Sequence, residues 1–189
     1  MNNLNIHCLE TERLILEPIS IKFCSTEYVN WLNDIEVYQY LDTGGNYTLE
    51  GLSDYLTKYT KNPILFWAII VKETNSHIGN IKIDPINQRN EIGEYGILMG
   101  DKNNWGKGYA KEASKAVIEY CFQTVGLRKI TLGVIKDNVA AVKLYELLGF
   151  QIEGIYQMHG IYAGKFCEAY RMAIFNHENP LVQNYFEKL

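Results

Sequence analysis

Apolar and polar positions alternate with two periods along the chain, and the change of period divides it into strands and helices. Short apolar or strictly alternating runs are typical of strands, whereas apolar residues three and four positions apart are typical of helices. The strands predicted in this way are residues 13–19, 66–72, 77–84, 91–99, 129–134, 150–156 and 168–174. The predicted helices are residues 25–32, 49–59 and 109–123, with a short helical turn at residues 37–41 and a further helix between Asn138 and Gly149. Loops are expected at residues 85–90 and around Gly160 and Gly164, and the tail at residues 177–189 is either a terminal helix or loose.

The order of these elements predicts one mixed α/β domain over residues 1–189. Successive strands favour a mainly antiparallel twisted sheet, and the interleaved helices are expected on both of its faces. A chain of 189 residues is long enough to bury a sizeable core, which we place at about residues 13–175. The remaining residues, 177–189, are predicted to form a polar tail.

Charge and cysteine usage restrict the classes of function. The formal net charge is −4 at pH 7, and nonspecific binding to nucleic acid or to an anionic membrane needs a basic face, so neither partner is expected. The four cysteines, Cys8, Cys24, Cys121 and Cys167, form no C-x-x-C pair and are typical of reduced thiols in a cytoplasmic protein. The histidines form no H-E-x-x-H motif, so no metal is expected. No apolar run approaches the length of a membrane-spanning helix.

The most informative stretch joins the apolar run at residues 92–99 to the helix that starts near Tyr109. Between them stands the sequence WGKGYA, at residues 105–110. Two glycines one residue apart let the backbone turn tightly with its N–H groups outward, and the first turn of a helix adds unpaired N–H groups and a partial positive charge. Together these features form a socket for an anion, most often a phosphate. A plain strand-to-helix turn is the alternative, because the stretch lacks both the Gly-Lys-Ser/Thr of a Walker A loop and the third glycine of a dinucleotide fingerprint.

A second segment, NVAAVKLYELLGF at residues 138–150, favours the anion socket over a plain turn. Asn138 is a good N-cap for a short helix, and Gly149 is a good residue to end it. Asn138 and Tyr145 are seven residues apart, so they lie near one face of that helix.

These two segments together resemble the GNAT N-acetyltransferase superfamily, in the branch that is similar to ribosomal-protein alanine acetyltransferases. The turn matches the family pattern Q/R-x-x-G-x-G/A at residues 105–110, with Trp105 where Gln or Arg is usual. The helix matches the branch pattern N-x-x-A/S-x-x-L-Y-E-x-x-G-F at residues 138–150. The similarity extends from about Arg13 to about Phe175.

The resemblance implies a GNAT-like fold and an acetyl-CoA-dependent N-acetyltransferase. In that fold two parallel strands, here residues 91–99 and 129–134, splay apart to hold the pantetheine arm, and a strand N–H faces the thioester carbonyl. The implied cofactor-binding residues are Ile97, Leu98 and Met99 for the arm, Trp105, Gly106, Lys107, Gly108, Tyr109 and Ala110 for the pyrophosphate, and Asn138 and Lys143.

Two residues are candidates for catalysis of amine attack on the thioester. An alkylamine has a pKa near ~10.4, so about one molecule in a thousand or fewer is neutral at pH 7, and a base or a desolvating pocket is needed. Glu94 is the candidate base, directly or through a water, and Glu91 is the second choice; a solvated or ion-paired carboxylate is the alternative for Glu94. Tyr145 is the candidate acid, because a phenol can protonate the departing thiolate; a packed aromatic is its alternative.

The acceptor is left open as a small-molecule or peptide amine. Trp31 and Asn33 are candidate substrate-binding residues, because their segment resembles one in GNAT members that acetylate amino sugars linked to nucleotides. The stretch from Glu153 to Met172 looks equally like polyamine and protein N-terminal acetyltransferases. Relatives commonly form homodimers, so a homodimer is open too. Two further alternatives are a CoA-binding sensor without turnover and a transferase of another acyl group.

Overall fold

The computed structural model describes residues 6–41, 44–61, 64–162 and 164–188. Its strands are β1 (Leu9–Glu10), β2 (Leu14–Pro18), β3 (Leu65–Val71), β4 (Ser76–Asn87), β5 (Ile92–Met99), β6 (Lys129–Ile135), β7 (Gln151–Tyr162) and β8 (Lys165–Phe175). Its helices are η1 (Ile21–Phe23), α1 (Thr26–Asn33), α2 (Ile35–Tyr38), α3 (Leu49–Lys61), η2 (Lys102–Asn104), α4 (Tyr109–Tyr120), η3 (Cys121–Val125), α5 (Val139–Leu147) and α6 (Pro180–Phe186).

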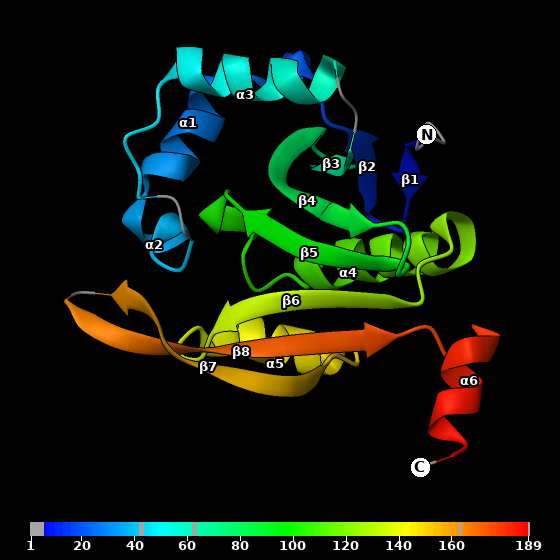
Figure 1. Cartoon of the computed structure of the whole chain (residues 1–189). Coiled ribbons are helices and arrows are strands. Elements are labelled where there is room, and N and C mark those ends of the chain that lie inside the picture. The colour runs from blue at the N-terminus through cyan, green and yellow to red at the C-terminus, as the bar shows by residue number, and fades with distance from the viewer. Residues whose placement is uncertain (1–5, 42–43, 62–63, 163, 189) are drawn as a thin grey trace. The chain divides into compact units, whose positions relative to one another are not determined.

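In the described residues the strands form one open eight-stranded sheet in the order β1-β2-β3-β4-β5-β6-β8-β7 (Figure 1). Sequential neighbours pair antiparallel from β1 to β4, whereas β5 and β6 pair parallel, from Ile92 opposite Lys129 to Glu94 opposite Thr131. The expected mixed α/β fold with a mainly antiparallel sheet and one parallel pair is therefore confirmed. The chain divides into two compact units, one with residues up to Asp84 and Gly96–Ala116, the other with Pro85–Tyr95 and the residues from Val117 onward.

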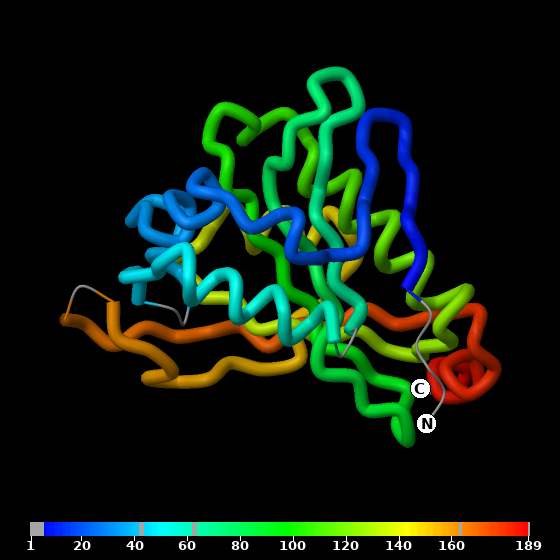
Figure 2. The backbone as a smooth tube through the Cα atoms, turned by 90° about the horizontal axis from the view of Figure 1, so that it is seen from above, coloured from blue at the N-terminus to red at the C-terminus, as the bar shows by residue number. Residues whose placement is uncertain are grey.

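Unit 1 contains β1 to β3, β4 up to Asp84, the end of β5 and the start of α4; the last residues of β4, from Pro85, belong to unit 2. Every residue of β3 is buried, which explains its continuous apolar sequence LFWAIIV: a strand covered on both faces needs no polar alternation. On one face Phe66, Ala68 and Ile70 pack with Leu52 and Leu56 of α3. The first turns of α4 lie on the other side of these strands (Figure 1). Figure 2 shows the β1–β2 and β3–β4 turns beside each other at one edge.

Unit 2 contains the start of β5, strands β6 to β8 and helices α5 and α6. Strand β6 pairs antiparallel with β8 from Lys129 opposite Phe175 to Ile135 opposite Ala169. Strands β7 and β8 form a long hairpin whose last pair is Tyr162 with Lys165. The start of β5 and the neighbouring strands β6 and β8 therefore lie together in this unit.

Three predicted boundaries were wrong. Strand β4 continues to Asn87, two residues beyond Pro85, because a proline is tolerated in a strand wherever its missing N–H is not needed by the ladder. The expected loop around Gly160 is mostly strand, since the β7–β8 hairpin extends to Tyr162 and Lys165 despite its glycines. The short helical turn expected at residues 37–41 lies earlier, as α2, because Asp34 caps it by accepting from the Glu36 N–H. The helix from Tyr109 continues past Tyr120 as the π-helical η3, and Gly126 ends it in the left-handed conformation.

The ends of the predicted elements were otherwise close to the observed ones. The tail contains a helix, α6, whose N-cap Asn179 accepts a hydrogen bond from the Leu181 N–H. The predicted cap at Asn138 is confirmed, because its Oδ1 accepts from the Ala141 N–H at 3.2 Å. Gly149 follows α5 with φ +94°, as expected of a residue that ends a helix.

Candidate functional site

The turn between β5 and α4 has the backbone that the glycines predicted. Gly106 and Gly108 have φ values of +74° and +82°, a region that side chains with a Cβ rarely adopt. The first bond of the helix runs from the Glu112 N–H to the Gly108 carbonyl. The N–H groups of residues 106–110 donate to no acceptor in the described part of the chain. This turn therefore presents free donors beside a helix N-terminus, as an anion site requires.

A network of Thr11, Arg13 and Glu112 fixes this turn to the strand region. Arg13 donates from Nη1 to the Lys107 carbonyl at 3.0 Å and from Nε to Glu112 at 2.7 Å. Its guanidinium also lies 4.6 Å from the ring centre of Tyr109. Glu112 accepts from the Thr11 hydroxyl at 2.6 Å and from the Arg13 backbone N–H at 2.8 Å. Burial acts to raise the pKa of Glu112, but hydrogen bonds from Thr11 and Arg13 outweigh it and lower that pKa.

Trp105 and Lys107, two of the predicted cofactor-binding residues, have partners within this region. The Trp105 indole donates to the Met99 carbonyl at 2.8 Å, which links the turn to the end of β5. The Lys107 ammonium donates to Asn104 at 3.0 Å and is exposed. Both side chains thus help hold the turn, and the Lys107 charge stays accessible to an anion.

The end of β5 carries the predicted pantetheine-binding residues Ile97, Leu98 and Met99, all of which are half-buried. The backbone of β4 approaches closely here, since a Cβ added at Gly79 would strike the Leu98 carbonyl oxygen. The neighbouring Gly100 likewise leaves no room for a Cβ, because the Trp31 indole lies against it.

The two predicted acceptor residues have different surroundings. Trp31 is half-buried and packs edge-on against His77, with ring centres 5.0 Å apart. His77 in turn bonds to Asn80, which is buried and whose Nδ2 has no hydrogen-bond partner in the described chain. Asn33 holds the backbone of Tyr47 at both ends of its amide, at 2.7 and 2.9 Å. Asn33 therefore has a structural role, and its contact with an acceptor stays a prediction.

In unit 2, the predicted acid Tyr145 lies on α5 and is only 7% exposed. Its ring meets those of Tyr95 and Phe150 nearly edge-on, at 5.6 and 5.8 Å. Burial raises the pKa of the Tyr145 phenol above its ordinary value, so the phenol stays protonated and is a weaker acid than an exposed tyrosine. Lys143, on the same helix, is exposed.

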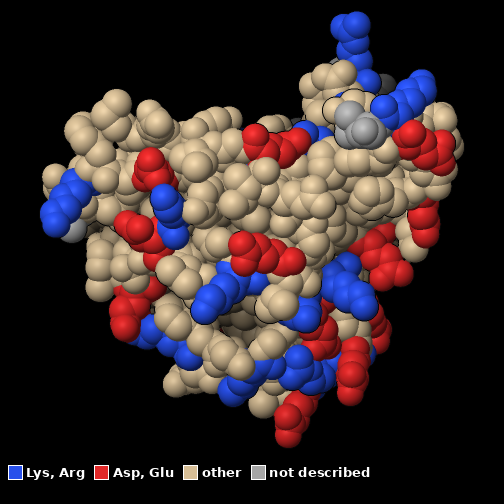
Figure 3. Space-filling model, turned by 90° about the horizontal axis from the view of Figure 1, so that it is seen from below, with Lys and Arg blue, Asp and Glu red and all other residues tan. Residues whose placement is uncertain are grey.

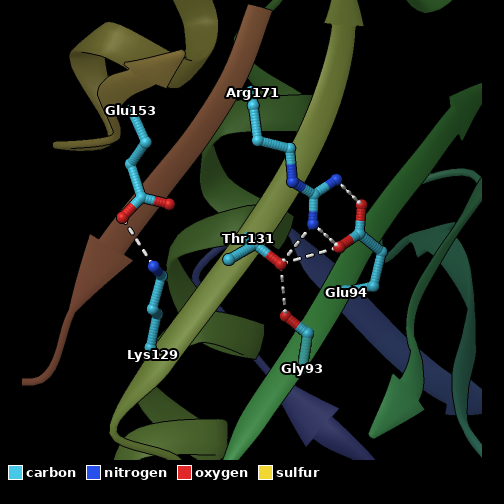
Figure 4. A network of polar contacts seen from close by, with 6 residues as sticks. All are labelled: Gly93, Glu94, Lys129, Thr131, Glu153 and Arg171. Carbon is cyan, nitrogen blue, oxygen red and sulfur yellow. Dashed lines mark hydrogen bonds and ion pairs between the residues drawn. The ribbon is translucent and has the colours of Figure 1, made fainter.

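The predicted base Glu94 is held by two residues that sequence reasoning missed (Figure 4). Arg171 reaches from β8 across β6 and grips both carboxylate oxygens, with Nη1 2.5 Å from Oε1 and Nη2 paired to Oε2. The buried Thr131 donates to Oε2 at 2.6 Å and accepts from Arg171 at 2.8 Å. This pairing with Glu94 raises the pKa of Arg171. The second choice, Glu91, lies in the turn before β5 with φ +52°.

Glu94 and Arg171 line an open groove of about 670 Å³. The other residues along it are Pro85, Ile86, Asn87, Gln88, Ile92, Gly93 and Thr131. The side chains of Glu94 and Arg171 are 29% and 27% exposed, so a ligand in the groove can reach both.

On the face shown in Figure 3, basic and acidic side chains are interspersed. Among the described residues no group of three or more His, Cys, Asp or Glu side chains is placed to hold a metal ion. No helix among them is both long and apolar enough to span a bilayer.

Comparison with known protein sequences identifies the family. The family model described as an acetyltransferase (GNAT) domain matches residues 13–151. The chain is 29% identical over 177 residues to an uncharacterized N-acetyltransferase, p20, from Bacillus licheniformis, covering 90% of this chain and 97% of that protein. It is 31% identical over 109 residues to spermidine N(1)-acetyltransferase from Escherichia coli (strain K12), covering 58% of each.

Solved structures show the same fold. Spermidine N-acetyltransferase from Vibrio cholerae, in complex with CoA and spermine, has a TM-score of 0.78 at 23% identity, covering 88% of this chain and 97% of that one. Ribosomal-protein-S5-alanine acetyltransferase from Vibrio fischeri has a TM-score of 0.78 at 20% identity, covering 90% and 97%. The predicted resemblance is thus confirmed: the chain belongs to the GNAT acetyltransferase family and is an acyltransferase.

Proposed function

We propose that the protein transfers an acetyl group from acetyl-CoA to a primary amine by direct attack in a ternary complex. The observation that carries this proposal is the turn at residues 105–110, which holds two left-handed glycines and free N–H groups at the start of α4. Acetyltransferases with this fold use acetyl-CoA, and a structural neighbour was solved with CoA. A diphosphate is the kind of anion that such a turn binds.

Each unit has its own proposed contacts with acetyl-CoA. In unit 1, the N–H groups of residues 106–110 would bind the pyrophosphate, with Lys107 adding charge, and residues 97–99 would bind the pantetheine amides. In unit 2, Asn138 and Lys143 would contact the coenzyme. The family model runs through both units, from residue 13 to residue 151, which supports our proposal that the chain acts as one domain.

The proposed reaction forms a C–N bond and breaks the C–S bond of the thioester. The ammonium form of the acceptor first loses a proton, and the attacking nitrogen loses a second as the amide forms, while the departing thiolate gains one. Glu94 is the proposed acceptor of amine protons, directly or through a water, and Glu91 is the second choice. Tyr145 is the proposed donor to the thiolate, because a phenol is protonated at neutral pH and its segment matches the family pattern.

The acceptor is proposed at the level of a primary amine. Spermidine acetyltransferases among the relatives keep polyamines in the set, together with protein N-termini, amino sugars linked to nucleotides and other small amines. Trp31 is proposed, on the resemblance, to contribute to acceptor binding. Asn33 is proposed to act beside it.

Two further proposals concern the state of the protein. We propose that it works in the cytoplasm, because its described cysteines, Cys8, Cys24, Cys121 and Cys167, are free thiols. We also propose a homodimer, because the edge strand β7 exposes apolar side chains such as Ile155 and Met158. Light scattering of the purified protein tests the dimer.

Calorimetry with acetyl-CoA and an acceptor screen with free-thiol detection test the proposed function. We expect binding at micromolar coenzyme and thiol release with at least one amine class. In Tyr145→Phe, kcat should fall about 100-fold while the Kd for acetyl-CoA stays unchanged, because only the proton donor is lost. The matched control is Tyr185→Phe on α6, where the side chain is exposed.

Three outcomes would contradict parts of this proposal. Absence of acetyl-CoA binding at high micromolar concentration would refute it as a whole. Binding with slow thioester hydrolysis and no amine product would favour a CoA-binding sensor. Faster turnover with succinyl-CoA or formyl-CoA than with acetyl-CoA would favour transfer of another acyl group.

A further inference from the structure

The hydrogen bonds of Glu94 leave one position open on its carboxylate. An ionised carboxylate has about four acceptor sites, two on each oxygen. Oε2 accepts from both Arg171 and Thr131, whereas Oε1 accepts only from Arg171 among the residues that the structure describes. Because the groove exposes this carboxylate, the open site on Oε1 is available to a donor such as an ammonium group.

Arg171 has open positions as well. A guanidinium carries five N–H donors. Three of them bond Glu94 and Thr131, and the other two, at Nε and Nη1, have no acceptor among the described residues. These two donors lie on opposite edges of the planar guanidinium, so either one of them, but not both, is available to the same carboxylate group.

The charges in the groove balance each other. Glu94 and Arg171 are the charged residues among those that line it; the others are apolar or carry neutral amide and hydroxyl groups. A polyamine with several ammonium groups would therefore find no unbalanced carboxylate here, and its second charge would be repelled by Arg171. A zwitterion laid across the ion pair would place each of its charges beside the opposite one.

We propose that this groove binds an acceptor whose ammonium and carboxylate are joined through one carbon, as in an α-amino acid. The inference rests on the proposed function and names the substrate class for it. The ammonium binds the open site on Glu94, and the carboxylate binds one open donor of Arg171. Glu94 and Arg171 are in direct contact, so their open positions suit two charges that are also close together. The apolar lining, including Ile86 and Ile92, suits an aliphatic side chain.

The experiment compares kcat/KM for leucine, leucinamide and spermidine, followed by release of free thiol. Leucinamide keeps the amine and the side chain but lacks the carboxylate. We expect leucine to exceed leucinamide by about 10- to 100-fold, the range of a hydrogen bond between charged groups. We expect spermidine to be the poorest of the three. Glucosamine 6-phosphate, in a further arm, reports whether a more distant phosphate can replace the carboxylate.

Variants of the ion pair sharpen this comparison. Arg171→Met should reduce the leucine-to-leucinamide ratio to about one and raise relative activity on spermidine, because Glu94 then keeps an unbalanced charge. Arg171→Lys retains the charge and should retain part of the ratio. The matched control is Lys129→Met, which also removes a cation paired with a glutamate, Glu153, but lies outside this groove (Figure 4). Its ratio should equal that of the wild type.

The comparison of substrates in the wild-type protein tests the proposed amino-acid acceptor even if Arg171→Met does not fold. Equal rates for leucine and leucinamide, a preference for spermidine or a preference for the phosphate would overturn the proposal. So would an unchanged ratio in a folded Arg171→Met. The proposed function itself would fail differently, with neither acetyl-CoA binding nor thiol release with any amine.

Discussion

Two networks of the same three residue types perform different tasks in this molecule. In unit 1, Glu112 is held by Thr11 and Arg13, and in unit 2, Glu94 is held by Thr131 and Arg171. Glu112 accepts three hydrogen bonds, from the Thr11 hydroxyl and from the backbone N–H and Nε–H of Arg13, and Arg13 Nη2 forms an ion pair with Oε2 at 2.6 Å. Each carboxylate oxygen thus has two partners, which is about the capacity of a carboxylate, so this network is closed.

The Glu94 network differs in being incomplete. Its carboxylate accepts three bonds and lines a groove, whereas the Glu112 side chain is 17% exposed and tied to the base of the glycine turn. A carboxylate whose hydrogen-bond positions are all occupied by the protein has none left for a ligand, so its role is structural. A carboxylate with an open hydrogen-bond position in a groove can also bind or deprotonate a ligand. The number of open hydrogen-bond positions, rather than residue type, therefore separates the structural network from the proposed catalytic one.

The strongest test of this difference replaces each glutamate by glutamine. We expect Glu94→Gln to lower kcat about 100-fold or more, the usual contribution of a general base. Glu112→Gln should change kcat less than tenfold at saturating acetyl-CoA, since Glu112 is proposed to touch no reactant. Steady-state kinetics on protein shown to be folded by circular dichroism makes the measurement. Equal losses in the two variants would erase the distinction.

A second test changes the turn that the closed network supports. Gly108→Ala places a Cβ on a residue at φ +82°, and the Arg13 guanidinium lies 3.5 Å from that position. The left-handed conformation costs such a residue about 1–2 kcal/mol, so the Kd for acetyl-CoA should rise about tenfold, as calorimetry would show. Gly44→Ala, where a Cβ meets open space, is the control. Unchanged binding in Gly108→Ala would argue against the turn as the pyrophosphate site.

The closed network around Glu112 should contribute to the free energy of unfolding. Glu112→Gln should lower the free energy of unfolding by about 1–3 kcal/mol at pH 7, because donors from Thr11 and Arg13 lose their full partner. Urea unfolding measures this loss. A loss larger than that of Glu94→Gln is expected, and the reverse order would contradict the assignment of roles.

The same loss should depend on pH in a defined direction. The pKa of Glu112 is lowered from 4.5 in the folded protein, so its carboxylate stabilises the fold fully above that value. The contribution is lost as the pH falls through the lower folded pKa. The difference between wild type and Glu112→Gln should therefore shrink when unfolding is measured at about pH 3 rather than pH 7.

The sequence predicted those parts of the site whose signals are local. Gly106 and Gly108 had to adopt positive φ for the turn, and Asn138 caps the helix that begins at the next residue. Arg171 could not be predicted, because its partner Glu94 is 77 residues away and charge patterns carry no information on such pairing. The same holds for Arg13 and Glu112, which are 99 residues apart.

Some predicted strand boundaries were wrong for a related reason. Pro85 and Gly160 locally disfavour a strand, yet both lie inside strands because tertiary pairing outweighs a propensity of at most about 1 kcal/mol. The groove depends on this: Pro85 and Asn87, beyond the predicted end of β4, line it. The expected substrate contacts of Trp31 and Asn33 rest on resemblance and stay predictions.

The smallest expected effect concerns the two threonines, and it tests whether open and closed networks respond differently to the same change. Thr11→Val removes a hydroxyl that donates to Glu112 at 2.6 Å and accepts from the Leu14 N–H at 3.0 Å, so unfolding should require about 1 kcal/mol less free energy. Thr131→Val also removes a donor to a glutamate, but its methyl group takes the place of the hydroxyl, and Oε2 of Glu94 keeps only its bond from Arg171. The Glu94 carboxylate is then held less firmly in the groove, so kcat/KM for the amine should fall by a few-fold in steady-state kinetics, whereas Thr11→Val should leave it unchanged. An unchanged kcat/KM in Thr131→Val would show that this hydroxyl does not position Glu94 for the acceptor.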